Sequence, residues 1–277
     1  MKKIYLLIAV MIFAASGLAV FETGLSDAAS TGYGDVPPEI GISGASLFGG
    51  NGISAGGGYK MSFGHSDFSE MGGYGYYGLE NIGRMGVDFT TFSVADLTSE
   101  TQIGVSFKRA LIDDVHNKLE FALRADIYSL SYEPSVTGQE LGSATTAGLT
   151  GAMQATLYER TRIAILAENL TGTSMGAEDD IDLPRSVTGL LGFAPYSKTE
   201  MAFYAKRTAG KDWEYAVMGY ARPIDFISFR AGVVTNPDRL TAGLGLHYSW
   251  FTLDYGIKTH PVLPLSHVIS LNFNLPV

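Results

Sequence analysis

The stretch 240–275 constrains the fold most, because its side chains alternate strictly between apolar residues and polar or small ones. The even positions are apolar in 240–248, whereas the odd positions are apolar in 251–257. A β-strand sends alternate side chains to opposite faces, so each run builds one apolar and one polar face. A two-residue turn between the runs keeps the apolar groups on one side, and a slip by one residue would divide them. The resulting register pairs Leu244 with Tyr255, Leu246 with Leu253 and Tyr248 with Phe251.

Similar alternation recurs along most of the chain and predicts about 14 strands. These candidate strands are 58–65, 72–80, 84–94, 101–110, 118–132, 145–158, 161–170, 185–194, 199–208, 213–221, 227–234, 240–248, 251–259 and 266–275. No segment with helical periodicity of useful length stands beside them. The predicted fold is therefore all-β, a closed antiparallel transmembrane β-barrel with apolar side chains facing lipid and polar ones facing the lumen.

The composition favours this barrel over a secreted β-sandwich. The chain has 34 Gly, 15 Phe and 15 Tyr, and only 17% of its residues are charged. A sandwich in water would carry many Lys and Glu on its outward face, whereas the polar face here is largely Gly, Ser, Thr and Asn. In hydrocarbon every backbone polar group must be paired, so a sheet that spans a membrane has to close. The absence of Cys excludes disulfides and thiolate sites.

Composition and periodicity divide the chain into three parts. Residues 1–19 resemble a secretory signal peptide, with Lys2 and Lys3 before an apolar run and small residues before the expected cleavage site. Residues 20–57 lack periodicity and form either a disordered leader or a segment folded into the lumen, and 58–277 form the barrel. Removing the signal leaves 17 basic (19 − 2) and 28 acidic side chains, a net charge of −11. That balance argues against nucleic acid as a partner.

The links between candidate strands predict which end of the barrel faces which side. Links after even-numbered strands are mostly short, such as 159–160 and 249–250, whereas long links such as 133–144 and 171–184 follow odd-numbered ones. Bacterial barrels place tight turns in the periplasm and longer loops outside. The pattern therefore predicts a bacterial outer-membrane location with the first strand rising from the periplasm. The link 109–118 is longer than this rule expects.

Two sets of side chains carry the predicted membrane and lumen contacts. Aromatic residues near strand ends suit the interfacial girdles of a membrane barrel; they are Tyr132, Tyr158, Trp213, Tyr248, Trp250 and Phe251. Inward positions carry charges of both signs, which can pair across the lumen and close it, whereas a selective pore would show a ring of one sign. The predicted lumen-lining residues are Lys108, Glu120, Arg124, Asp126, Arg162, Glu168, Arg230, His247 and Asp254.

Catalysis is not expected. His247 and Ser249 share a face with Asp254 diagonally across the hairpin, but a Ser/His/acid hydrolase needs direct hydrogen bonds and an oxyanion site. The other histidines show no metal-ligand spacing. The chain is therefore predicted to be no enzyme and to use no metal or cofactor.

Several fragments resemble outer-membrane barrels of the FadL superfamily, including PorV-type proteins. These are Ala167-Glu168-Asn169-Leu170, Leu183-Pro184-Arg185-Ser186-Val187 with Gly192-Phe193-Ala194, Ser228-Phe229-Arg230-Ala231-Gly232, and Gly243-Leu244-Gly245-Leu246 through Leu253-Asp254-Tyr255 to Ser266-His267-Val268-Ile269-Ser270-Leu271. The resemblance covers residues 160–275 and implies a fourteen-stranded barrel with an N-terminal segment in its lumen. Such proteins often carry Asn-Pro-Ala near the mature N-terminus, whereas 43–47 reads Ser-Gly-Ala-Ser-Leu. The alternative is therefore a luminal hatch that is altered or absent.

Two functions are favoured over an enzyme or a general porin. The first is a conduit for small hydrophobic solutes, and the alternative is a non-enzymatic scaffold or secretion-associated interaction barrel. Expected partners are outer-membrane lipid, the barrel-assembly machinery through the C-terminal strand, and either a hydrophobic small molecule or a secretion component. An apolar pocket facing a break in the wall would favour transport, whereas a lumen filled by 20–57 would favour the scaffold.

Overall fold

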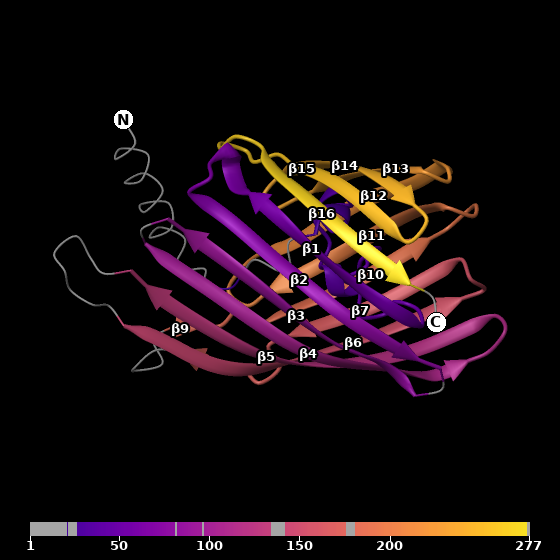
Figure 1. Cartoon of the computed structure of the whole chain (residues 1–277), viewed down its shortest axis with the longest axis horizontal. Helices are drawn as coiled ribbons and strands as arrows, with labels where there is room; N and C mark the ends of the chain where they lie inside the picture. Colours follow the sequence, from indigo (N-terminus) through magenta and orange to yellow (C-terminus); the bar gives the residue numbers. More distant parts are fainter. Residues whose placement is uncertain are drawn as a thin grey trace.

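The computed structural model describes residues 21, 27–80, 82–95, 97–133, 142–175 and 181–275. The predicted signal peptide, 1–19, lies outside these residues. Fourteen antiparallel strands close into one barrel, in which β16 pairs with β1 (Figure 1). The barrel strands are β1 (Gly52–Met61), β2 (Phe68–Leu79), β3 (Gly83–Val94), β4 (Thr98–Asp113), β5 (Asn117–Tyr132), β6 (Ser143–Leu157), β7 (Thr161–Glu168), β10 (Ser186–Phe193), β11 (Thr199–Thr208), β12 (Trp213–Ile224), β13 (Ile227–Val234), β14 (Arg239–Tyr248), β15 (Phe251–Lys258) and β16 (Ser266–Leu275).

The barrel confirms the predicted fold class and strand count. The β14–β15 hairpin has the predicted register, with Leu244 opposite Tyr255 and Leu246 opposite Leu253. Alternation places these leucines on the outer surface, where Leu244 and Leu253 are each 38% exposed in the absence of lipid. In a membrane this apolar surface contacts acyl chains. Among the described residues, no helix has both the length and the apolar character needed to cross a membrane.

Several strand boundaries differ from the prediction by a few residues, and two of these differences have a clear cause in the sequence. Strand β1 begins at Gly52 rather than Gly58, because the glycines at 56–58 have no side chains to reveal an alternation. The predicted link 109–118 is mostly strand, since β4 runs to Asp113 and β5 starts at Asn117. A bulge between Ala110 and Ile112 shifts the pairing register there. The bulge breaks the period of two that marks a strand in the sequence.

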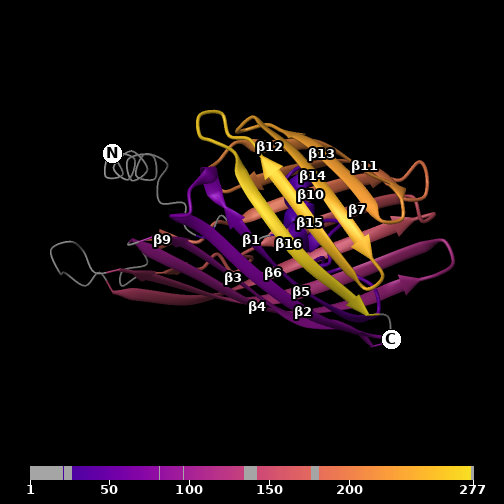
Figure 2. The same cartoon turned by 45° about the horizontal axis from the view of Figure 1, so that its top comes forward.

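Residues 27–48, here called the luminal segment, lie inside the barrel (Figure 2, indigo). The segment contains α2 (Ala28–Gly32) and the 3₁₀ turn η1 (Pro38–Ile40). Asp27 caps α2, since its carboxylate accepts a hydrogen bond of 2.7 Å from the Ser30 N–H. Tyr33 and Ile40 are fully buried in one apolar cluster with wall residues such as Leu166. The lumen is therefore packed rather than open along this segment.

Glycines let α2 approach the wall closely. A Cβ added to Gly32 would lie 2.6 Å from the Cα of Gly243 on β14, too close for any side chain. A Cβ on Gly256 of β15 would meet the Ala28 carbonyl oxygen at 2.6 Å. The helix thus rests backbone to backbone on the inner face of β14 and β15.

Two short strands form a separate sheet beside the barrel end. These are β8 (Ser174–Met175) and β9 (Ile181–Asp182), which follow β7 in the link before β10. A second 3₁₀ turn, η2 (Ser62–Gly64), follows β1. The links at this end are the longer ones, so we call it the long-link end. The opposite end, where β16 finishes and the 249–250 turn lies, is the short-turn end.

Candidate functional site

The nine side chains predicted to line the lumen all occupy inward positions on their strands, and most are paired. On β5, Arg124 contacts Asp88 and Asp126, each at 2.8 Å. The adjacent pair Lys108–Glu120 has an N–O distance of 2.6 Å. These groups are buried, so each charge depends on its partner for the interactions that water would otherwise supply.

Other inward charges on the wall are also paired. Arg230 pairs with Asp254 at 2.7 Å, and Arg162 contacts Glu200 at 2.6 Å. The Glu168 carboxylate lies 3.6 Å from the ammonium group of Lys206.

The hydrogen bonds of His247 do not form the rejected hydrolase arrangement. Its ring nitrogens contact Ser228 at 2.8 Å and Thr252 at 3.1 Å. Ser249 and Asp254, the other two members of that arrangement, are not its partners in these contacts. The half-buried imidazole thus belongs to the polar lining of the wall.

Sequence reasoning missed the acidic residues through which the luminal segment contacts the wall. Glu39 accepts a 2.7 Å hydrogen bond from Arg124. Asp35 lies 3.1 Å from Arg239 on β14 and 2.9 Å from Lys258 on β15. Burial alone would raise the pKa of the Asp35 carboxyl, but Lys258 and Arg239 together hold it well below its usual range. No pattern in 27–48 signals these partners, because the contacts join residues 85 to 223 positions apart.

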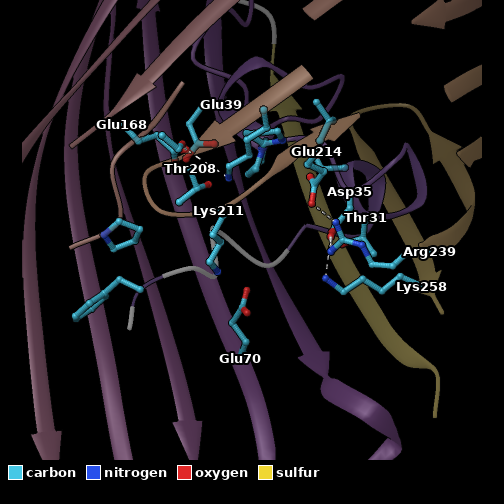
Figure 3. Close-up of a pocket in the computed structure, with 18 of the residues that line it drawn as sticks. Thr31, Asp35, Glu39, Glu70, Glu168, Thr208, Lys211, Glu214, Arg239 and Lys258 are labelled. Atoms are coloured by element: carbon cyan, nitrogen blue, oxygen red, sulfur yellow. Dashed lines mark hydrogen bonds and ion pairs between the residues drawn. The ribbon is translucent and has the colours of Figure 1, made fainter. Parts of the chain in front are cut away.

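A cavity of about 690 Å³ lies between the luminal segment and the long-link end. Figure 3 shows Asp35 beside Arg239 and Lys258 at one side of it, with Glu39 and Glu168 on the other. Charged and polar residues from strand ends, links and the luminal segment form most of this lining. The cavity is therefore a polar vestibule above a plugged lumen, not the apolar pocket that the transport hypothesis anticipates.

An apolar cluster borders this vestibule. Phe21, Tyr128, Leu130, Met175 and Leu183 pack together and are all buried. The rings of Phe21 and Tyr128 meet edge to face with centroids 5.1 Å apart, and both residues, with Leu183, line the cavity. These three residues give the vestibule an apolar patch at the long-link end of the lumen.

The wall is interrupted next to this cluster. Strand β6 starts at Ser143, but its ladder with β7 reaches only from Leu157 to Gly151. Beyond that point the chain leaves the ladder at Asn169, which has a positive φ of 48°. Two contacts bridge the notch, from the Leu170 N–H to the Leu149 carbonyl at 2.7 Å and from the Thr173 hydroxyl to the Ala147 carbonyl at 2.8 Å.

The six aromatic residues predicted for the membrane girdles lie at both barrel ends. Tyr158, Tyr248, Trp250 and Phe251 are at the short-turn end, and Trp213 begins β12 at the long-link end. Tyr132 differs, because its even position on β5 is inward-facing and it packs against the apolar cluster at the vestibule.

A closed barrel with an apolar outer belt and a polar, plugged interior is the architecture of bacterial outer-membrane proteins. The fold thus supports the predicted outer-membrane location. No protein-family model matches the chain, and no curated protein is similar to it.

Several solved structures have folds similar to this chain. The monoaromatic hydrocarbon channel CymD has a TM-score of 0.66 at 12% identity, covering 94% of this chain and 100% of that chain. For the toluene transporter TbuX of Ralstonia pickettii the TM-score is 0.63 at 11% identity, covering 92% and 100%. A FadL homologue of Pseudomonas aeruginosa gives 0.61 at 11% identity, with the same coverage of 92% and 100%. This chain therefore has a FadL-like fold of fourteen strands.

Proposed function

We propose that this chain is an outer-membrane conduit for small hydrophobic solutes. The observation that carries the proposal is the apolar cluster of Phe21, Tyr128, Leu130, Met175 and Leu183, which borders both the vestibule and the interrupted wall beside β6. Apolar surface at the mouth of a barrel gives such a solute a favourable place to leave water or lipid. The names of CymD and TbuX, a hydrocarbon channel and a toluene transporter, support the same solute class.

Passage requires the luminal segment to move. The segment fills the barrel below the vestibule and is held by the contacts of Glu39 with Arg124 and of Asp35 with Arg239 and Lys258. The charged vestibule gives a hydrocarbon little to bind, so retention is expected at the apolar cluster and not deeper. We infer a cycle in which the solute docks at the cluster and crosses when the segment shifts.

Uptake measurements test this proposal. Cells of a lipopolysaccharide-bearing host that express the barrel are compared with cells carrying an empty vector. Initial uptake of radiolabelled toluene is expected to rise with the amount of folded barrel, while uptake of a hydrophilic sugar stays at the vector level. Equal toluene uptake in both strains rejects the conduit, and a parallel rise in sugar uptake indicates a general porin.

A scaffold is the second candidate, and the filled lumen favours it. Residues 27–48 pack against the wall inside the lumen and pair with its charges, which suits a protein that acts through its surfaces rather than its lumen. In that case toluene uptake stays unchanged while the barrel is present at the cell surface. We also propose that β16 serves the assembly machinery as the C-terminal strand, which a truncation of 266–275 would test through loss of membrane-inserted protein.

A further inference from the structure

Strand β4 extends past its neighbour β3 at the short-turn end. The ladder between them stops at the pair Arg84–Lys108, yet β4 continues to Asp113. Over 109–113 the strand pairs with β5 on one side, and on its other side no strand of the described chain accompanies it. Figures 1 and 2 show the β4–β5 hairpin reaching out at the end where the C-terminus lies. We call residues 109–113 the free edge.

Other uneven strand ends at the short-turn end are covered by a turn. The N–H of Arg222 bonds the Lys198 carbonyl at 2.9 Å, and that of His247 bonds Phe226 at 2.9 Å. Asn274 makes the equivalent contact with Trp250 at 2.8 Å. Along the free edge, the described residues of the β2–β3 turn make no such contact. Among the described residues, the free edge therefore keeps backbone groups unpaired, whereas the equivalent groups at the other strand ends bond a turn.

Apolar side chains surround these backbone groups. Leu111, Ile112 and Val115 are 60%, 51% and 80% exposed. The turn that carries Val115 is preformed, because the Asp114 carboxylate accepts the N–H groups of His116 at 2.8 Å and Asn117 at 2.6 Å. A rigid tip with clustered exposed apolar residues is typical of a protein interaction site.

Lipid does not suit this position. Unpaired backbone N–H and C=O groups are strongly unfavourable in hydrocarbon, and Asp113 and Asp114 flank the apolar residues. The free edge therefore belongs in water or against polypeptide. In bacterial barrels the short-turn end faces the periplasm, so the polypeptide that can reach it is periplasmic.

We propose that the free edge of β4 binds an extended segment of a periplasmic protein by β-strand addition. The added strand continues the ladder where β3 ends and places alternate apolar side chains beside Leu111. The exposed Arg109 lies at the membrane-proximal end of the edge, so the bound segment carries an acidic residue there. This interaction is independent of solute passage.

A synthetic peptide tests the proposal with the purified full-length barrel in detergent. The probe is a fluorescent eight-residue peptide of alternating Val and Thr with one terminal Glu, and binding is followed by anisotropy. Saturable binding is expected. Two further peptides are N-methylated at alternate amides, one at the odd positions and one at the even positions. Each keeps its side chains but lacks the backbone donors along one of its two edges. For one of these two peptides the affinity is expected to fall at least tenfold.

Barrel variants complete the test. Ala110→Pro removes an edge N–H and is expected to abolish binding, whereas Tyr196→Ser, an exposed position in the β10–β11 turn away from the edge, retains it. Heat-modifiable mobility on gels verifies that each variant is folded. Equal binding of all peptides would show simple apolar adhesion and overturn the proposal. Two further results would also overturn it. The first is self-association of the barrel that Ala110→Pro removes. The second is a nitroxide at position 111 that is relaxed by lipid-soluble oxygen rather than by a water-soluble nickel complex.

Discussion

Arg124 and Glu39 lie 2.7 Å apart, and this contact joins the luminal segment to the barrel wall. The same guanidinium also holds Asp88 of β3 and Asp126 of β5, each at 2.8 Å. One arginine thus contacts three carboxylates, two from the wall and one from the segment. Its removal affects wall stability and segment docking together.

Arg124→Met is expected to destabilise the barrel by about 3–5 kcal/mol, because it leaves buried carboxylates unpaired. The free energy of unfolding in guanidinium, measured on vesicle-inserted protein, checks this value. Lys198→Met is the matched control, since its partner Asp225 and the lysine itself are exposed and such pairs contribute little. Similar losses in the two variants would contradict the structural role of Arg124.

Acid is expected to release the luminal segment through Asp35. The folded-state pKa of this carboxyl is lowered, so its contribution is present above the unfolded pKa of about 3.9 and is lost as pH falls further. Protease cleavage within 27–48 should therefore be slow at pH 7 and increase below pH 4. Asp35→Asn should cleave readily at both values. A wild-type segment that stays protected at pH 2–3 would refute this dependence.

Gly32→Ala is expected to weaken docking of α2 on β14. Its new methyl group would stand 2.6 Å from the Gly243 Cα, and overpacking of this kind costs about 1–3 kcal/mol. Faster proteolysis of 27–48 in an otherwise folded barrel is the readout. Gly219→Ala on β12 serves as control, because a Cβ there meets nothing within 4 Å, and it should leave the segment protected.

A disulfide between segment and wall is expected to stop solute passage. The Ala28 N–H lies 3.2 Å from the Ser270 hydroxyl oxygen, and the natural chain has no Cys to interfere. Ala28→Cys with Ser270→Cys should block toluene uptake when oxidised and recover it with reductant. Each single variant controls for the substitution itself. Unchanged uptake by the oxidised double variant would show that the segment need not move.

The barrel could be predicted from the sequence because its physics is local. One residue in two faces lipid, and the hairpin of β14 and β15 shows this period without interruption. The prediction of strand boundaries fails where this period is hidden. The glycines at 56–58 concealed the start of β1, and the bulge at Ala110–Ile112 made the end of β4 resemble a link.

The site was only half predictable. Inward charges such as Arg124 and Asp254 follow from strand parity, but their partners on the luminal segment do not. Asp35 and Glu39 sit in a stretch without periodicity and meet side chains from distant strands. Which acid meets which base depends on the path of that stretch through the lumen, and no local pattern encodes this path. The polar vestibule follows from those same contacts.

The order of elements has a consequence for biogenesis. From Asp27, which lines the vestibule, the chain runs through the lumen to Gly52 at the short-turn end. This segment precedes β1 in the sequence, and β1 pairs with β16, the last strand of the barrel. The barrel is thus closed by pairing its first and last strands, and the luminal segment lies inside the closed barrel. Machinery that joins β1 to β16 must therefore close the barrel around the luminal segment, or the segment must enter the lumen after closure.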